Sequence, residues 1–162
     1  TGGSPTMHPA LVNELTHFAN ERDIFITIET EGSHFLPTDY PINLLSISPK
    51  FSNSIPVVGA KTPQGEIVDE RMVKKHNSKR MNIEAIKQSI AYHSDYHIKP
   101  VIDKELTMIP EVDEMIKELN VPPEKVWAMP AGDDRESLFV RDKGWRFTGR
   151  SHIMAFNTER CV

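Results

Sequence analysis

The sequence is poor in cysteine, in long hydrophobic runs and in excess positive charge. Its single cysteine, Cys161, excludes an internal disulfide and a metal site built from several thiolates of this chain. No apolar run reaches the roughly 18 residues that a membrane-spanning helix needs. Acidic residues outnumber basic ones by 23 to 19, and the net charge of -4 disfavours a protein that depends mainly on nucleic-acid contacts. We therefore expect neither a membrane nor a nucleic acid as partner.

The start of the chain also lacks the charged and apolar regions of a signal peptide. Together with the single cysteine, this predicts a reducing, cytoplasmic location. The first residue is threonine, and residues 1–5 read as a Gly-Gly-x-Pro turn, so we expect the beginning of the protein to be missing. With 162 residues, 38% of them hydrophobic, the chain is long enough for one domain with its own core.

Helical and strand patterns alternate along the chain. Residues 8–23 predict an amphipathic helix with Leu11, Leu15, Phe18 and Ala19 on its apolar face. Further helices are expected at 83–90 behind a possible Asn82 cap, at 110–120 and at 133–144. β-Branched and aromatic runs predict strands at 24–28, 43–47, 96–102, 126–130 and 146–157. This order predicts an α/β fold, a partial β/α barrel with mostly parallel strands.

Residues 51–81 interrupt the alternation and are interpreted as an insertion within the single domain 1–162. Two short apolar runs flank residues 61–65, which predicts a β-hairpin. The hairpin is followed by a basic tract, residues 71–80, with five lysines and arginines. We interpret this tract as the solvated face of a loop, with a surface for a protein partner as the alternative.

In parallel α/β folds, ligands bind at the carboxyl ends of the strands. Five polar or glycine-containing segments are candidates for this edge: 1–5, 29–32, 48–50, 129–132 and 152–162. Glu29 ends an apolar strand and is either a rim residue, a salt-bridged residue or a ligand contact. Lys50 is part of a strand stop or a partner for a carboxylate or phosphate. His34, His97 and His152 share no metal-ligand spacing, so no histidine metal site is expected.

Three of these segments become specific in combination. A Thr-Gly-Gly-x-Pro turn before a helix, a strand ending in Glu-Thr-x-Gly and a strand ending in Ser-Pro-Lys occur in this order at residues 1–5, 29–32 and 48–50. In this order the chain resembles the 7-carboxy-7-deazaguanine synthases, a family of radical S-adenosylmethionine enzymes. The resemblance covers nearly all 162 residues but only the later part of the family's barrel. Ser4 stands where the family usually has an acidic residue.

The resemblance implies a radical lyase in queuosine-type 7-deazaguanine biosynthesis. The family uses S-adenosyl-L-methionine, a [4Fe–4S] cluster and Mg²⁺ to convert 6-carboxy-5,6,7,8-tetrahydropterin into 7-carboxy-7-deazaguanine. A reductant such as flavodoxin and a homodimer are the partners it implies. The family's CxxxCxxC motif is absent, so the cluster ligands are not in this chain and the chain alone is expected to be inactive.

Site residues follow from the resemblance position by position. It implies Glu29 as a polar contact at the reacting centre, with a salt-bridged barrel residue as the alternative. Substrate contacts are implied for Thr1, for His152 and for the terminal carboxylate of Val162, with a satisfied core histidine and a frayed tail as alternatives to the last two. The residues implied to line the cofactor are Gly3, Ser48, Pro49, Lys50, Met129, Pro130, Ala131 and Gly132.

Two other functions stay open at this stage. A glycyl-radical-enzyme activase of the same superfamily shares the Gly-Gly turn but acts on a protein, which the basic tract would suit. A non-catalytic α/β binding domain that lacks the cluster half is the third hypothesis. A CxxxCxxC motif upstream of Thr1 would favour an enzyme, whereas a start codon near Thr1 would favour the binding domain.

Overall fold

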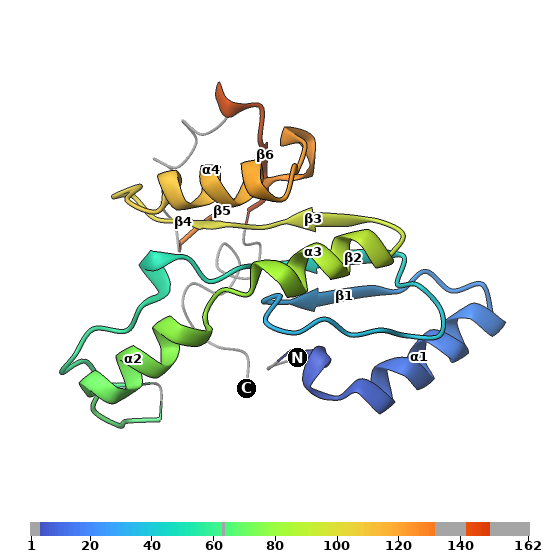
Figure 1. Ribbon diagram of the computed structural model, residues 1–162, viewed down its shortest axis with the longest axis horizontal. Coiled ribbons are helices and arrows are strands. Elements are labelled where there is room, and N and C mark those ends of the chain that lie inside the picture. The colour runs from blue at the N-terminus through green and yellow to red at the C-terminus, as the bar shows by residue number, and fades with distance from the viewer. Residues whose placement is uncertain (1–3, 63, 132–141, 150–162) are drawn as a thin grey trace.

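The computed structural model describes residues 4–62, 64–131 and 142–149. Its α-helices are α1 (Pro9–Glu21), α2 (Glu70–Lys79), α3 (Ile83–Tyr92) and α4 (Ile109–Glu118). Short 3₁₀ turns lie at η1 (Pro5–Met7), η2 (Ser52–Ser54) and η3 (Pro123–Lys125). The strands are β1 (Thr27–Thr30), β2 (Leu44–Ile47), β3 (Tyr96–Ile98), β4 (Val101–Ile102), β5 (Trp127–Pro130) and β6 (Arg146–Phe147). Figure 1 shows how these elements follow one another.

All paired strands run parallel, in two three-stranded sheets of order β1-β2-β3 and β4-β5-β6. The sheets are continuous at their junction, because β3 and β4 are separated only by Lys99 and Pro100 and a parallel bridge joins Ile98 to Val126. The expected α/β class with parallel strands is confirmed. The described strands do not close into a barrel.

The strand expected at 96–102 is divided at Pro100. Proline has no N–H to donate, so the hydrogen-bond ladder breaks at this position. The flanking groups still bond: Lys99 donates its N–H to the carbonyl of Ile47 at 2.6 Å, and the Pro100 carbonyl accepts from Met129 at 3.0 Å. The chain therefore passes from one sheet to the other at Pro100, and the strands of both sheets run parallel.

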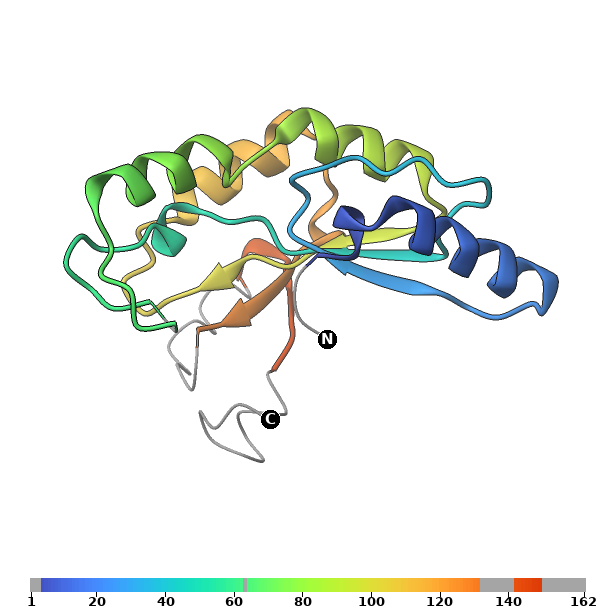
Figure 2. The same ribbon diagram turned by 90° about the horizontal axis from the view of Figure 1, so that it is seen from below.

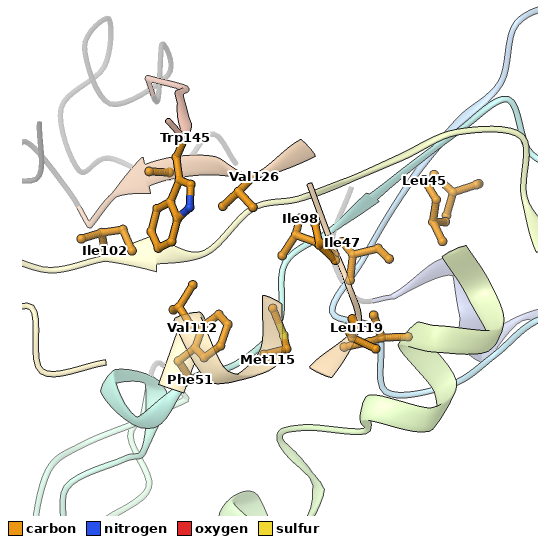
Figure 3. Close-up of a cluster of buried hydrophobic side chains, with 14 of the residues drawn as sticks. Leu45, Ile47, Phe51, Ile98, Ile102, Val112, Met115, Leu119, Val126 and Trp145 are labelled. Carbon is orange, nitrogen blue, oxygen red and sulfur yellow. The ribbon is translucent and has the colours of Figure 1, made fainter. Parts of the chain in front are cut away.

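The hydrophobic core lies between one face of the strands and the helices. Ile47, Ile98 and Val126 are fully buried on three neighbouring strands. Val112 and Met115 of α4 reach the same cluster (Figure 3). In Figure 2, α3 and α4 lie on one side of the strands. The alternate residues of each strand point to the opposite face, which is where polar side chains occur.

Helix α1 forms where the sequence predicts it, but it buries a different face. The expected apolar residues Leu11, Leu15 and Phe18 are 59%, 43% and 50% exposed. The buried residues of the helix are Val12, Thr16 and Ala19. Thr16 is buried without an unsatisfied hydroxyl because it donates to a backbone carbonyl one turn earlier, at 2.8 Å. Of the predicted face, only Ala19 is buried.

The insertion contains the expected hairpin, with an antiparallel bridge between Lys61 and Ile67. The basic tract at 71–80 is different from the expectation: it forms helix α2 rather than a loop. Asp69 caps the helix by accepting the N–H of Met72 at 2.7 Å. No proline or glycine occurs from 70 to 80, and lysine, arginine and methionine are good helix formers. The absence of apolar periodicity hid this helix at the sequence level.

The remaining boundaries agree with the sequence within a few residues. Asn82 caps α3 as expected, since its side chain accepts the N–H of Ala85 at 3.1 Å. Asn120 ends the α4 segment with a φ of 52°, a conformation that asparagine tolerates. Strand β1 begins at Thr27 instead of residue 24. The helix expected at 133–144 and the final strand at 146–157 lie largely outside the described residues.

Candidate functional site

The carboxyl ends of the parallel strands gather several of the expected site residues at one edge. Residues 48–50 follow β2, and residues 129–131 lie at the end of β5, with β3 and β4 between them. Glu29 is the third residue of β1, just before its end. Thr1, Gly3, Gly132, His152 and Val162 lie outside the described residues.

The N-terminal turn lies against the end of β1, as the order of motifs suggested. The Ser4 hydroxyl is 3.0 Å from that of Thr30, the last residue of the strand, and 2.8 Å from that of Thr6. The nearby Ser4 hydroxyl also helps to lower the pKa of Glu31. A serine at this position therefore connects two of the motifs directly.

A row of polar residues crosses the face of the sheet that points away from α3 and α4. Glu29 is in register with Ser46 on β2, and Ser46 is in register with His97 on β3. Register partners on neighbouring strands point to the same face. The three side chains therefore lie side by side, one on each strand.

Lys99 stabilises the ionised form of Glu29. Its ammonium nitrogen lies 2.7 Å from Oε1 of Glu29, and the lysine side chain is only 16% exposed while the glutamate is 75% exposed. The hydrogen bond and the charge of Lys99 hold the pKa of Glu29 below its usual range. The site thus has an ionised carboxylate that is fixed in direction and accessible to a ligand.

Two buried polar atoms in this row have no hydrogen-bond partner among the described residues: Oγ of Ser46 and Nε2 of His97. Such atoms usually have a partner, because an unpaired buried polar group costs about 1–3 kcal/mol. Burial, together with the charge of Lys99, lowers the pKa of His97, so its imidazole is neutral at pH 7. A neutral imidazole and a hydroxyl can each donate or accept one hydrogen bond to a ligand.

Trp127 extends the row onto β5. Its ring centroid is 5.4 Å from that of His97, and the Arg146 guanidinium lies 5.3 Å from the ring of Trp127. Flat aromatic and guanidinium surfaces suit the faces of a planar heterocycle. Sequence reasoning missed Ser46, Lys99 and Trp127 as site residues. The available signal was the alternation within each strand, which places these residues opposite the core positions.

A cavity of about 830 Å³ lies between residues that follow β1 and β2 and one face of α2. It is lined by four cations and one carboxylate: Lys50, Lys75, Lys79, Arg80 and Glu31. Burial opposes ionisation of Glu31, but hydrogen bonds from Ser33 and Ser4 outweigh it and lower its pKa. Lys50 is the one residue of the Ser-Pro-Lys segment that lines this cavity.

Arg80 and Glu111 hold the loop that carries Lys50. The Arg80 guanidinium donates to the Lys50 carbonyl at 2.9 Å and to Glu111 at 2.5 Å. The other oxygen of Glu111 accepts the N–H of Ser52 at 2.8 Å. Burial acts to raise the pKa of Glu111, but the bonds from Arg80 and Ser52 outweigh it and the pKa is lowered. Glu111 is therefore ionised at neutral pH and fixes both sides of the loop.

We expect Glu111→Gln to lower the free energy of unfolding by about 1–3 kcal/mol at pH 7, since it leaves Arg80 without its charged partner. A lowered folded-state pKa stabilises above the unfolded pKa of the group and loses this contribution as the pH falls through the folded pKa. The difference from wild type should therefore shrink below the ordinary pKa of glutamate. Urea unfolding at a series of pH values measures it.

Glu105→Gln is the matched control, because the one ion pair of Glu105 with a described residue is that with Lys104 at 3.7 Å, and both side chains are more than half exposed. It should change stability by less than about 0.5 kcal/mol at every pH. A constant deficit of Glu111→Gln down to acid pH would contradict the assigned ion pair.

Within residues 4–62, 64–131 and 142–149, no group of three or more histidine, cysteine, aspartate or glutamate side chains is arranged to hold a metal ion. The same residues include no helix that has both the length and the apolar character to cross a bilayer.

No protein-family model matches the chain. Two curated proteins are similar to it along nearly all its length, and both are named 7-carboxy-7-deazaguanine synthase. The protein from Rhodopirellula baltica is 28% identical over 169 residues, which include 99% of this chain and 61% of that protein. The protein from Halobacterium salinarum is 28% identical over 172 residues, or 97% of this chain and 63% of that protein.

The chain thus spans 61–63% of the length of these relatives. The motifs at 1–5, 29–32 and 48–50, the parallel α/β fold and the two alignments agree with one another. The resemblance inferred from the motifs is confirmed: over almost its whole length, this chain is similar to 7-carboxy-7-deazaguanine synthases.

Proposed function

We propose that this chain is part of an enzyme that converts 6-carboxy-5,6,7,8-tetrahydropterin into 7-carboxy-7-deazaguanine for queuosine-type bases. The observation that carries the proposal is the similarity to two synthases of this name over 97–99% of the chain. The polar row supports it, since a planar heterocycle with several donors and acceptors needs such partners. In this proposal the protein is cytoplasmic, and a reductant such as flavodoxin supplies electrons.

The chain's own residues would bind and orient the substrate. Glu29 would accept hydrogen bonds from the N–H edge of the pterin, because its charge is fixed by Lys99. Ser46 and His97, with their unpartnered polar atoms, would bind further polar groups of the ring. Trp127 would cover the face of the heterocycle. These contacts hold one C–H bond in place for abstraction and exclude water.

The residues of this chain suit one of the cofactors that the resemblance implies and not the others. A [4Fe–4S] cluster that binds S-adenosylmethionine needs three thiolates, and the chain has one cysteine, so the cluster does not fit the residues of this chain. The described residues provide no acidic cluster for Mg²⁺ either. For S-adenosylmethionine itself, Lys50 beside the cavity is a suitable partner for its carboxylate. With one cysteine in the chain, the thiolate ligands of the cluster would come from outside it.

The test uses the full-length protein with its cluster reconstituted under anaerobic conditions. Incubation with the pterin, S-adenosylmethionine, Mg²⁺ and reductant should yield 7-carboxy-7-deazaguanine and 5′-deoxyadenosine, detected by mass spectrometry. Cleavage of S-adenosylmethionine without consumption of the pterin would refute the proposed substrate. A glycyl radical formed on an added protein would instead favour the activase, and absence of a cluster in the full chain would favour a binding domain.

A further inference from the structure

One face of α2 forms a wall of the cavity beside the ends of β1 and β2. Met72, Lys75, His76 and Lys79 line it. Residues three and four apart lie on the same side of a helix, so these side chains share one face. Lys74, which neighbours Lys75 in sequence, does not line the cavity.

Core packing does not explain this helix. None of its described side chains is buried, in contrast to α1, α3 and α4. Its first turn is capped by Asp69, and its C-terminal end is joined to the rest of the fold by Arg80, which bonds to the Lys50 carbonyl and to Glu111. The cationic face is therefore held over the strand ends without contributing to the core.

The charges of the cavity are not balanced by the described part of the protein. Lys50, Lys75 and Lys79 form no ion pair within the described ranges. The one carboxylate among the described lining residues, Glu31, stays ionised, because its pKa is lowered, but it offsets only one of the four cations. A hollow lined by one sign of charge concentrates ions of the opposite sign.

His76 gives a second, independent observation. Its Nδ1 atom is buried and has no hydrogen-bond partner in the part of the chain that the structure describes. Burial and the nearby charges of Arg80 and Lys50 lower its pKa, which indicates that the imidazole lies in a positive potential. A buried, unpartnered nitrogen beside unpaired cations is suited to an oxyanion, which accepts hydrogen bonds from all of them.

We propose that this cavity binds a small molecule through an oxyanion group, a phosphate or a carboxylate, held by Lys75, Lys79 and His76. Two lysines one turn apart on α2 approach the anion from one side, and Lys50 approaches it from the ends of the strands. The inference shares Lys50 with the contact proposed for S-adenosylmethionine but is carried by Lys75, His76 and Lys79 of α2, which the proposed reaction does not use.

The test titrates the full-length protein with inorganic phosphate, pyrophosphate and citrate by calorimetry. We expect at least one of these anions to bind, and Lys75→Ala and Lys79→Ala each to weaken that binding about tenfold or more. Pyrophosphate and citrate distinguish a phosphate from a carboxylate ligand. Lys74→Ala is the matched control, because it removes the same charge from the same helix outside the cavity, and its affinity should change less than twofold. Circular dichroism checks that each variant is folded.

The histidine NMR signals add a readout that general charge effects would not reproduce. The cations Lys50, Lys75, Lys79 and Arg80 line the same cavity as His76. A bound anion offsets their positive charge, so the pKa of His76 should rise when the anion binds. Failure of all three anions to bind would overturn the proposal. An equal loss in Lys74→Ala and Lys75→Ala would also overturn it, since a diffuse positive surface would then be responsible.

Discussion

Gly32→Ala should lower the free energy of unfolding by about 2–5 kcal/mol, more than Gly59→Ala. Gly32 follows β1 with a φ of 78°, a conformation that costs a residue with a Cβ about 1–2 kcal/mol. The added Cβ would also lie 2.7 Å from Ile86 and 3.0 Å from Ile47, two side chains that are fully buried. Overpacking of this kind costs about 1–3 kcal/mol more. Urea unfolding measures the sum.

Gly59→Ala separates the two contributions. Gly59 has a φ of 85°, but no atom lies within 4 Å of the position of an added Cβ. This variant should lose only the conformational part, about 1–2 kcal/mol. If both variants lose the same amount, the close packing of Gly32 against the core contributes nothing, and the contact with Ile86 is wrong.

Gly32 also shows how far the sequence could predict the fold. The Glu-Thr-x-Gly segment marked the end of a strand, and the alternation of elements predicted the parallel α/β order. The face that α1 buries was not predictable, because Val12, Thr16 and Ala19 form a stripe only one residue away from the more apolar one. Which stripe packs depends on the sheet, and a single helix pattern contains no such information. The helix in the basic tract was missed because it lacks an apolar periodicity, and none of its side chains is fully buried.

The site was predictable in part, for a similar reason. Motifs at strand ends identified Glu29 and Lys50, since carboxyl ends of parallel strands meet at one edge. The partners of Glu29 depend on register between strands far apart in the sequence. Lys99 is 70 positions away, and His97 joins the row only through the pairing of β2 with β3. Register of this kind follows from the folded sheet and is not encoded in any local spacing.

The polar row gives the second large effect. Under the proposed function, we expect Glu29→Gln in the full-length protein to lower kcat/KM for the pterin about tenfold to hundredfold, because a hydrogen bond to a charged group contributes about 1.5–3 kcal/mol. Glutamine has nearly the same shape but cannot hold the negative charge that Lys99 stabilises. Because the Glu29 side chain is 75% exposed, the free energy of unfolding should fall by no more than about 1 kcal/mol, although Lys99 loses its charged partner. Product formation and urea unfolding are measured on the same preparations, and Glu105→Gln, an exposed glutamate outside the row, should keep full turnover.

Lys99→Gln tests whether Lys99 positions and charges Glu29 or only supports the fold. Without the ammonium, the pKa of Glu29 should rise toward its ordinary value, because the hydrogen bond and the charge of Lys99 are the largest causes of its lowering. The acid limb of the pH–turnover profile should therefore move to higher pH in Lys99→Gln, whereas Lys99→Arg keeps the charge and should restore the wild-type profile in part. A purely structural lysine would lower stability and leave the pH profile in place. An unchanged profile together with full turnover in Glu29→Gln would show that the reaction takes place elsewhere on the protein.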